Sequence, residues 1–239
     1  LGDVYKRQDY KVYRQLPGGE TTSYTVHAGR YKTRPNSVIT PTGERFEYAS
    51  PEETPALMAD LVQWYNNAVV EGSLTPIQLA ALFHYRYIRI HPFEDGNGRI
   101  ARLMVNFILR RHNWPMTVIR SKNKKAYLNA LGLADAAVGP IPADGAHASL
   151  KSIAPFVEYM ESALTADISS MLEFLSSDKE TMWWYEGEIV RFSTPTPARI
   201  IRVLQSEPNA SLSKISTTLG ISRSAIQKQV DNLAEKGYI

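Results

Sequence analysis

The chain has 239 residues, of which 44% are hydrophobic and 21% are charged, as is typical of a soluble globular protein. Its net charge of +3 is too small to indicate a nucleic-acid-binding protein by itself, and the absence of cysteine excludes disulfide and thiol chemistry. No apolar run approaches the roughly 20 residues that span a bilayer, and the N-terminus lacks the apolar core of a signal peptide. We therefore expect a cytoplasmic protein without a membrane segment.

The two ends of the chain are typical of a fragment. It begins at Leu1 rather than at methionine, and it stops at "EKGYI", where a further element is due. We expect residues 1–23 to be an N-terminal segment that is truncated or partly foreign, and residues 1–8 are left out of the fold prediction.

A β-hairpin is predicted next, because "SVIT" and "RFEY" mix β-branched and aromatic residues around the turn signal "PTG". A helix then follows, with Thr54 as its cap, Pro55 at the first helical position and Gly72 at its end. Apolar residues at helical spacing predict four more helices. The first two begin at Thr75–Pro76 and at about Ile100, and the other two span residues 123–137 and 154–176. Residues 166–194 are expected to be a helix end and a linker, in which Trp183 and Trp184 pack on other residues.

The stretch "HPFEDGNGRIAR", residues 91–102, combines residue types that packing alone does not explain. His91 ends a helix, because Pro92 forces the backbone out of helical geometry, and an imidazole pKa near neutrality suits a general base. Asp95 is either an oxygen ligand of the kind that Mg²⁺ takes or a helix N-cap.

The second half of this stretch indicates an anion site. Gly96, Asn97 and Gly98 allow consecutive backbone N–H groups to point at one anion where a helix begins. Arg99 and Arg102 are three residues apart on that helix and share a face. Two guanidinium groups beside such a nest indicate a polyphosphate rather than a single carboxylate. The whole stretch therefore predicts a nucleotide site with Mg²⁺ and a base.

The stretch matches the Fic family signature HPFxDGNGRxxR at every fixed position, and the chain resembles that family over residues 24–165. "GRYKTRPNSVITPTGERFEY" is similar to the family's flap, and "WPMTVIRSKNKKAYLNAL" to the segment whose tyrosine faces the nucleotide. The resemblance implies a mainly α fold, a Fic-type helical bundle with a β-hairpin flap. The flap residues it implies are Ser37, Val38, Ile39 and Thr40.

This resemblance implies adenylylation (AMPylation), in which ATP donates AMP to a Ser, Thr or Tyr hydroxyl of a target protein. ATP would lie on the nest with its distal phosphates at Arg99 and Arg102, and Asp95 would hold Mg²⁺. Tyr127 and Asp135 would lie near the nucleotide, although many relatives have an asparagine where Asp135 stands. His91 would be the base, and the flap would hold the target by strand addition.

Three alternatives stay open. The phosphotransferase branch of the family transfers the γ-phosphate, but it usually has lysine where Gly98 stands. Removal of AMP at the same site is the second alternative, and a nucleotide-sensing DNA-binding regulator is the third.

Fic proteins are commonly restrained by a helix bearing [S/T]xxxE[G/N], whose glutamate pairs with the second arginine, here Arg102. The chain contains only near misses to this spacing, around Glu71 and Glu186. We therefore expect the inhibitory helix upstream of Leu1 or on a partner protein, and the fragment to be constitutively active. The sequence also leaves open whether the chain forms a homodimer.

Residues 195–239 resemble a winged helix-turn-helix with a truncated wing. Ser211 is expected to cap one helix, Gly220 to form the turn, and residues 222–237 to be the recognition helix. Arg223 and Lys228 would contact DNA phosphates. Because such modules also bind proteins or dimerise, both kinds of partner stay open.

Overall fold

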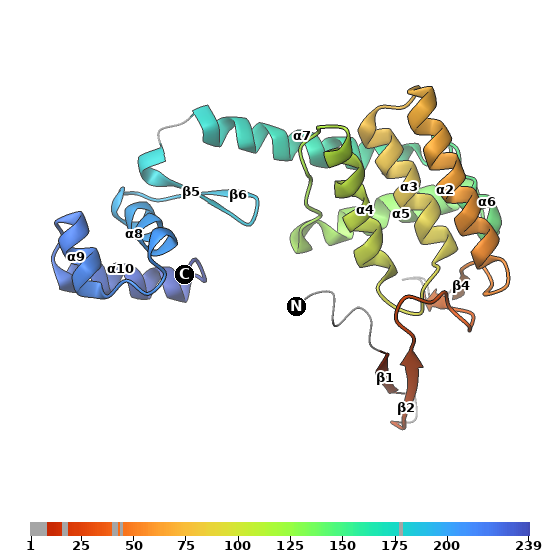
Figure 1. Ribbon diagram of the computed structural model, residues 1–239, viewed down its shortest axis with the longest axis horizontal. Helices are drawn as coiled ribbons and strands as arrows, with labels where there is room; N and C mark the ends of the chain where they lie inside the picture. The colour runs from red at the N-terminus through yellow and green to blue at the C-terminus, as the bar shows by residue number, and fades with distance from the viewer. Residues whose placement is uncertain (1–8, 16–18, 40–42, 44, 177–178) are drawn as a thin grey trace. The chain divides into compact units, whose positions relative to one another are not determined.

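The computed structural model describes residues 9–15, 19–39, 43, 45–176 and 179–239. The chain divides into two compact units, residues 1–164 and residues 165–239, and the division falls inside one long helix (Figure 1). Among the helices of the described residues, none combines the length and the hydropathy that crossing a membrane requires.

Two β-hairpins precede the helices of the first unit. Strands β3 (Ser37–Ile39) and β4 (Arg45–Glu47) pair antiparallel with Val38 opposite Phe46, which confirms the predicted hairpin. Thr40, predicted as a flap residue, lies outside the described residues. Strands β1 (Tyr10–Gln15) and β2 (Thr21–Val26) form a hairpin that was not predicted. Its residues are mostly polar and exposed, so they lack the apolar alternation that marks a strand.

The rest of the first unit is a helical bundle, which confirms the predicted mainly α fold (Figure 1). The predicted helices occur close to their expected bounds, and a short helix, α6, was not predicted. The helices are α2 (Thr54–Glu71), α3 (Pro76–Ile90), α4 (Asn97–Arg111), α5 (Lys124–Val138), α6 (Pro142–Ala146) and α7 (Ala154–Ser176), with a 3₁₀ turn η1 (Ser121–Asn123) before α5.

Helix α3 is the central helix of this bundle, since eleven of its fifteen residues are buried. It begins at a capping box, in which the Thr75 side chain accepts from Gln78 N and the Gln78 side chain accepts from Thr75 N. The packing of α3 on all sides fixes its last turn, which carries Arg89 and ends at His91.

The start of α2 differs from the prediction. Thr54 is its first helical residue and Glu53 is the N-cap, because Ser50 and Glu53 bond each other reciprocally at 3.0 and 3.2 Å. The Thr54 hydroxyl donates back to the Ser50 carbonyl at 2.7 Å instead of capping. Gly72 ends the helix as predicted, in the left-handed conformation at φ 64°.

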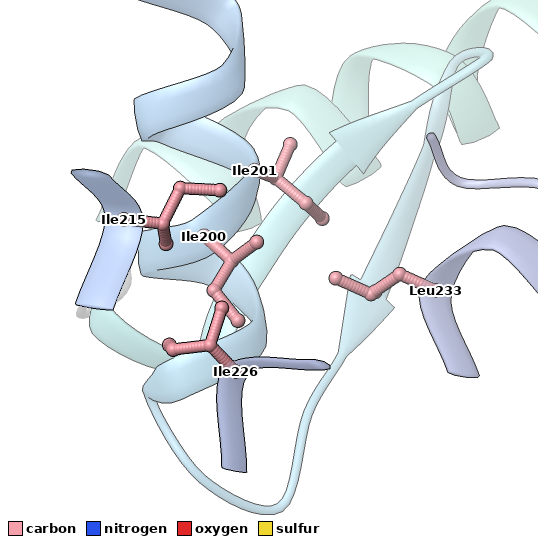
Figure 2. Packing of buried hydrophobic residues seen from close by; sticks show 5 residues of the cluster. All are labelled: Ile200, Ile201, Ile215, Ile226 and Leu233. Atoms are coloured by element: carbon pink, nitrogen blue, oxygen red, sulfur yellow. The ribbon is translucent and has the colours of Figure 1, made fainter. Parts of the chain in front are cut away.

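The second unit contains three short helices around an apolar core. They are α8 (Thr196–Ser206), α9 (Leu212–Leu219) and α10 (Arg223–Glu235). Ser211 caps α9 and left-handed Gly220 ends it, as predicted. The core consists of isoleucines from all three helices with a leucine of α10 (Figure 2): Ile200, Ile201, Ile215, Ile226 and Leu233.

The segment expected to be a linker contains a third hairpin instead. After a 3₁₀ turn, η2 (Lys179–Thr181), strands β5 (Met182–Tyr185) and β6 (Glu188–Arg191) pair around Glu186 and Gly187. Both turn residues have positive φ, as a two-residue hairpin turn requires. Trp183 packs against the core of the second unit, and the Trp184 ring lies 5.6 Å from that of Phe174. The hairpin is therefore an integral part of this unit.

Candidate active site

His91 occupies a strained position at the end of α3. Its backbone is left-handed, with φ 51° and ψ 60°, and its N–H donates to the Tyr87 carbonyl at 2.9 Å. Such a conformation costs a non-glycine residue about 1–3 kcal/mol and persists only where the surroundings enforce it. The strain turns the chain sharply out of α3, so that the following residues form a loop before α4.

The His91 imidazole is held neutral. Its ring stacks on the Tyr48 ring at 3.9 Å with an interplanar angle of 16°. Burial lowers the pKa of His91 to about 4, and the Lys32 ammonium acts in the same direction, while the Asp95 carboxylate opposes it. At neutral pH the imidazole therefore carries no charge and can accept a proton, as a general base must.

Asn97 stabilises the loop with its side chain. Its Oδ1 accepts from Phe93 N at 3.0 Å, and its Nδ2 donates to the Phe93 carbonyl at 2.7 Å. Because the Asn97 side chain is buried and bonded in this way, any contact to an anion would come from its backbone N–H. The Phe93 ring lies 5.8 Å from the Tyr31 ring and anchors the loop to the segment before β3.

The two glycines of the motif lie where α4 begins. Gly96 is the left-handed N-cap at φ 82°, a conformation that glycine adopts without steric cost. At Gly98 an added Cβ would lie 3.3 Å from Nη1 of Arg102, so the glycine leaves room for that guanidinium. The free N–H groups of this first turn, together with the helix dipole, can bind an anion.

Asp95 accepts three hydrogen bonds. Its Oδ1 accepts from Gly96 N at 2.6 Å, and its Oδ2 accepts from the Tyr10 hydroxyl at 2.7 Å and from Nη2 of Arg99 at 3.1 Å. The Tyr10 bond is the main reason that the pKa of Asp95 lies below its usual value. Tyr10 belongs to the unpredicted hairpin, so sequence reasoning missed this contact.

Arg102 lies beside a buried pair of aromatic residues. The Tyr127 hydroxyl and Nε2 of His84 are 3.0 Å apart. Burial raises the pKa of Tyr127 to about 12, while the neighbouring Arg102 acts in the opposite direction. Burial also lowers the pKa of His84 to about 3, with the Arg102 charge as a second cause. Tyr127 is therefore next to the motif's second arginine.

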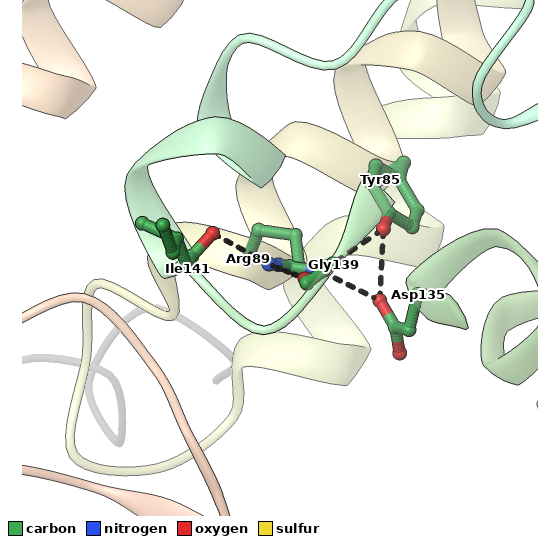
Figure 3. Close-up of polar contacts among 5 residues, drawn as sticks. All are labelled: Tyr85, Arg89, Asp135, Gly139 and Ile141. Carbon is green, nitrogen blue, oxygen red and sulfur yellow. Dashed lines mark hydrogen bonds and ion pairs between the residues drawn. The ribbon is translucent and has the colours of Figure 1, made fainter. Parts of the chain in front are cut away.

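Asp135 belongs to a polar network that joins α3 to α5 (Figure 3). Its Oδ1 accepts from the Tyr85 hydroxyl at 2.8 Å and from Nη1 of Arg89 at 3.1 Å. Nη2 of Arg89 donates to the carbonyls of Gly139 and Ile141 at 2.8 and 2.7 Å. The second carboxylate oxygen of Asp135 points away from the other residues drawn, so a nucleotide contact there stays a prediction.

The flap strand β3 has an open edge. In the described part of the chain, β3 and β4 form a two-stranded sheet, so β3 pairs only with β4. Val38 is 46% exposed in this strand. An extended segment of another protein can pair with such an edge.

The second unit presents basic side chains on α10. Arg199 pairs with Glu180 and Lys214 with Glu207, while Arg202 donates to the Lys179 carbonyl. Three exposed cations form no ion pair with any residue that the structure describes, and all lie on α10 or at its C-cap: Arg223, Lys228 and Lys236.

Two family models match the chain. One, for the Fic/DOC family, matches residues 8–109, and one described as winged helix-turn-helix DNA-binding matches residues 195–239. The chain is 58% identical to a Fic domain containing signaling protein from Bacteroides thetaiotaomicron. That crystal structure aligns with a TM-score of 0.61, over 62% of this chain and 55% of the other.

The curated relatives share only part of their length with this chain. It is 31% identical over 159 residues to protein adenylyltransferase fic-1 of Caenorhabditis elegans, which covers 66% of this chain and 27% of the relative. It is 39% identical over 85 residues to protein adenylyltransferase Fic of Drosophila willistoni, which covers 36% of this chain and 17% of the relative. The chain thus contains a Fic/DOC family domain at residues 8–109, followed by a winged helix-turn-helix at residues 195–239.

Proposed function

We propose that this chain is a protein adenylyltransferase, which moves AMP from ATP to a Ser, Thr or Tyr hydroxyl of a target protein. The observation that carries the proposal is the neutral, strained His91 next to a glycine-rich helix start with two arginines. The names of the Caenorhabditis and Drosophila relatives support the same activity.

ATP would bind with its phosphates at the first turn of α4. The backbone N–H groups of Gly96–Gly98 would donate hydrogen bonds to the phosphates, and Arg99 and Arg102 would bind the distal phosphates. Arg99 suits this role because its side chain is 73% exposed and pairs with Asp95 at the surface. A surface ion pair contributes little free energy, so Arg99 can leave Asp95 and bind a phosphate instead. Tyr127 lies beside Arg102 and would border the nucleotide.

Asp95 would contribute to binding Mg²⁺. A single carboxylate fits this ion, because Mg²⁺ typically takes one or two carboxylates together with substrate phosphates. Among the described residues, no group of three or more His, Cys, Asp or Glu side chains could hold a metal ion without such phosphates. When bound, Mg²⁺ would neutralise negative charge on the phosphates.

His91 would accept the proton of the target hydroxyl. The hydroxyl oxygen forms a bond to the α-phosphorus, the bond from that phosphorus to the bridging oxygen breaks, and pyrophosphate leaves. The target segment would pair with the open edge of β3, which positions its hydroxyl through backbone hydrogen bonds.

Transfer of label separates this activity from its alternatives. We expect protein-bound label from α-labelled ATP and a loss of about 10²–10⁴ in rate for His91→Ala, with ATP still bound. Label from γ-labelled ATP would instead establish a phosphotransferase, and loss of AMP from a pre-labelled target would establish the reverse activity. No label from either ATP, with nucleotide bound, would favour a nucleotide-sensing regulator.

DNA binding by residues 195–239 is a second proposed function, favoured by the three exposed cations on α10 and at its C-cap, which form no ion pair with a residue that the structure describes. In a salt titration of the full chain with duplex DNA, Arg223→Ala and Lys228→Ala should each reduce the salt slope by about 1. Absence of binding at low salt would favour a protein partner for this domain.

A further inference from the structure

The backbone around His91 is held by a short segment that precedes β3. Three carbonyls that flank His91 accept hydrogen bonds from this segment. Lys32 Nζ donates to the Ile90 carbonyl at 2.9 Å, and Lys32 N donates to the Pro92 carbonyl at 2.8 Å. Nδ2 of Asn36 donates to the Phe93 carbonyl at 3.0 Å. The chain is therefore held on both sides of the histidine.

The two side chains also support each other. Lys32 Nζ donates to Oδ1 of Asn36 at 2.9 Å, and only 3% of Lys32 is exposed. The main-chain carbonyl of Asn36 accepts from Tyr48 N at 3.3 Å, and the Tyr48 ring stacks on the His91 ring. The same segment thus supports both the backbone and the ring of the histidine.

These hydrogen bonds stabilise the backbone conformation of His91. The left-handed conformation of His91 is one that a non-glycine residue leaves unless its neighbours enforce it. Pro92 has no N–H, so the residue that follows His91 cannot donate a hydrogen bond to hold this geometry. Buried carbonyls need donors, and Lys32 and Asn36 provide them at the positions that define the turn.

The charge of Lys32 adds an electrostatic effect. The charged or titratable groups that face His91 are Lys32, Asp95 and Tyr48. The ammonium disfavours a second positive charge on the imidazole, whereas the Asp95 carboxylate favours it. Burial lowers the pKa of Lys32 itself to about 8, while Glu53 opposes this shift. Lys32 is therefore largely protonated at pH 7, and its charge adds to the effect of burial, which is the main cause of the low pKa of His91.

We propose that Lys32 and Asn36 are positioning residues for the base, because they hold His91 in its left-handed conformation beside the nucleotide site. This inference rests on the proposed function of His91. A lysine buried against main-chain carbonyls could serve packing alone, so the test requires measurements that packing alone would not change.

The first measurement separates kcat from KM. We expect Lys32→Met to lower kcat about 10- to 100-fold, since a misplacement of the order of 1 Å can cost that much, while the KM for ATP stays within about twofold. Asn36→Ala should lower kcat in the same way but less. Arg86→Met is the matched control, because Arg86 also donates to a main-chain carbonyl, that of Ala148 at 2.7 Å, away from the motif. It should reduce stability and leave kcat unchanged.

The second measurement does not depend on activity. NMR titration of the His91 ring should show its pKa rising towards 6.5 in Lys32→Met and staying low in Lys32→Arg, which keeps the charge. If Lys32→Met does not fold, the kcat of Asn36→Ala tests the proposal instead, because Asn36 is only partly buried and its replacement is better tolerated.

Failure of this proposal is distinguishable from failure of the proposed function. Wild-type kcat in both Lys32→Met and Asn36→Ala, or an equal loss in Arg86→Met, would overturn the positioning role while the transferase activity stands. If the wild-type chain transfers no AMP but the His91 titration responds to Lys32→Met as expected, the proposed function fails, whereas the inferred effect of Lys32 on the His91 ring stands.

Discussion

Two arginine–aspartate pairs in the first unit have similar distances, but one arginine is buried and the other is exposed. Arg89 and Asp135 are 3.1 Å apart, and the Arg89 side chain is 1% exposed. Arg99 and Asp95 are also 3.1 Å apart, but the Arg99 side chain is 73% exposed. Arg89 further donates to Tyr85 and to two main-chain carbonyls, whereas Arg99 lies on the surface of the motif.

The distance within an ion pair therefore says little about its role. The two terminal nitrogens of the buried Arg89 guanidinium donate to fixed acceptors, so it cannot exchange partners without leaving a buried charge unpaired. A surface pair is weak and exchanges readily with water or with an anionic ligand. This difference favours a role of Arg89 in the stability of the fold and supports the proposed role of Arg99 in binding phosphate.

The largest effect is expected from breaking the buried pair. Arg89→Met should lower the free energy of unfolding by about 3–5 kcal/mol, because Asp135 and the two carbonyls lose their donor. Arg99→Met, its exposed counterpart, should change it by no more than about 0.5 kcal/mol. Urea unfolding of both variants measures this, and equal losses would refute the distinction between the two pairs.

A pH titration extends the comparison to the buried histidines. The pKa values of His91 and His84 are about 4 and 3 in the folded chain, against 6.5 when unfolded. Between these values the unfolded chain binds more protons, so the free energy of unfolding rises with pH and falls as the pH drops below 6.5. We expect a loss of about 2 kcal/mol for each histidine between pH 6.5 and 4.5, or about 4 kcal/mol for the two together.

His91→Gln tests the source of this loss. Urea unfolding at several pH values should show a shallower dependence in the variant, even if its stability is lower throughout. An unchanged slope would mean that His91 does not contribute.

A glycine beside Arg89 tests how rigid the buried guanidinium is. A Cβ added at Gly145 would lie 2.5 Å from Cγ of Arg89 and 2.6 Å from its Cζ. Because Arg89 is held by several acceptors, Gly145→Ala should cost about 1–3 kcal/mol. At Gly132, in α5, an added Cβ would meet no described heavy atom within 4 Å, so Gly132→Ala should stabilise by about 0.5–1 kcal/mol. Thermal unfolding that ranks the two variants the other way would contradict a rigid Arg89.

The smallest effect is expected at the exposed pair. The Tyr10 hydroxyl bonds the Asp95 oxygen that also pairs with Arg99, and so competes for the proposed Mg²⁺ ligand. Tyr10→Phe should lower the Mg²⁺ concentration needed for half-maximal ATP binding about 2- to 10-fold, the equivalent of one hydrogen bond. Tyr13→Phe, on the same strand and 67% exposed, should leave it unchanged. Weaker Mg²⁺ dependence in both variants, or in neither, would exclude competition by Tyr10.

Much of the local structure could be predicted from the sequence. The helices of the bundle follow from apolar spacing, and Thr75, Ser211 and Gly220 are at helix ends as their residue types indicate. The hairpin β5–β6 had a local signal as well, since Glu186 and Gly187 lie between two runs of apolar and aromatic residues. The structure places a hairpin in this segment, and a two-residue turn with positive φ at both positions is typical of one.

The roles of Lys32, Tyr10 and Arg89 could not be predicted in the same way. Lys32 bonds a carbonyl 58 positions away, and Tyr10 bonds an aspartate 85 positions away. Nothing in the residues next to Lys32 or Tyr10 specifies such partners. Asn97 shows the same limit within the motif, because its side chain bonds Phe93 and only its backbone is left for an anion.

The candidate site could be located from the sequence alone, because the proposed base, the aspartate, the glycines and the arginines lie within twelve consecutive residues. Local rules of helix ends and glycine conformation act over such short distances, so their outcome can be read from the chain. Which of these side chains are exposed and able to bind a ligand depends on the tertiary structure. Burial and hydrogen-bond partners depend on segments far apart in the chain, and these set the charge of His91 and the separate roles of Arg89 and Arg99.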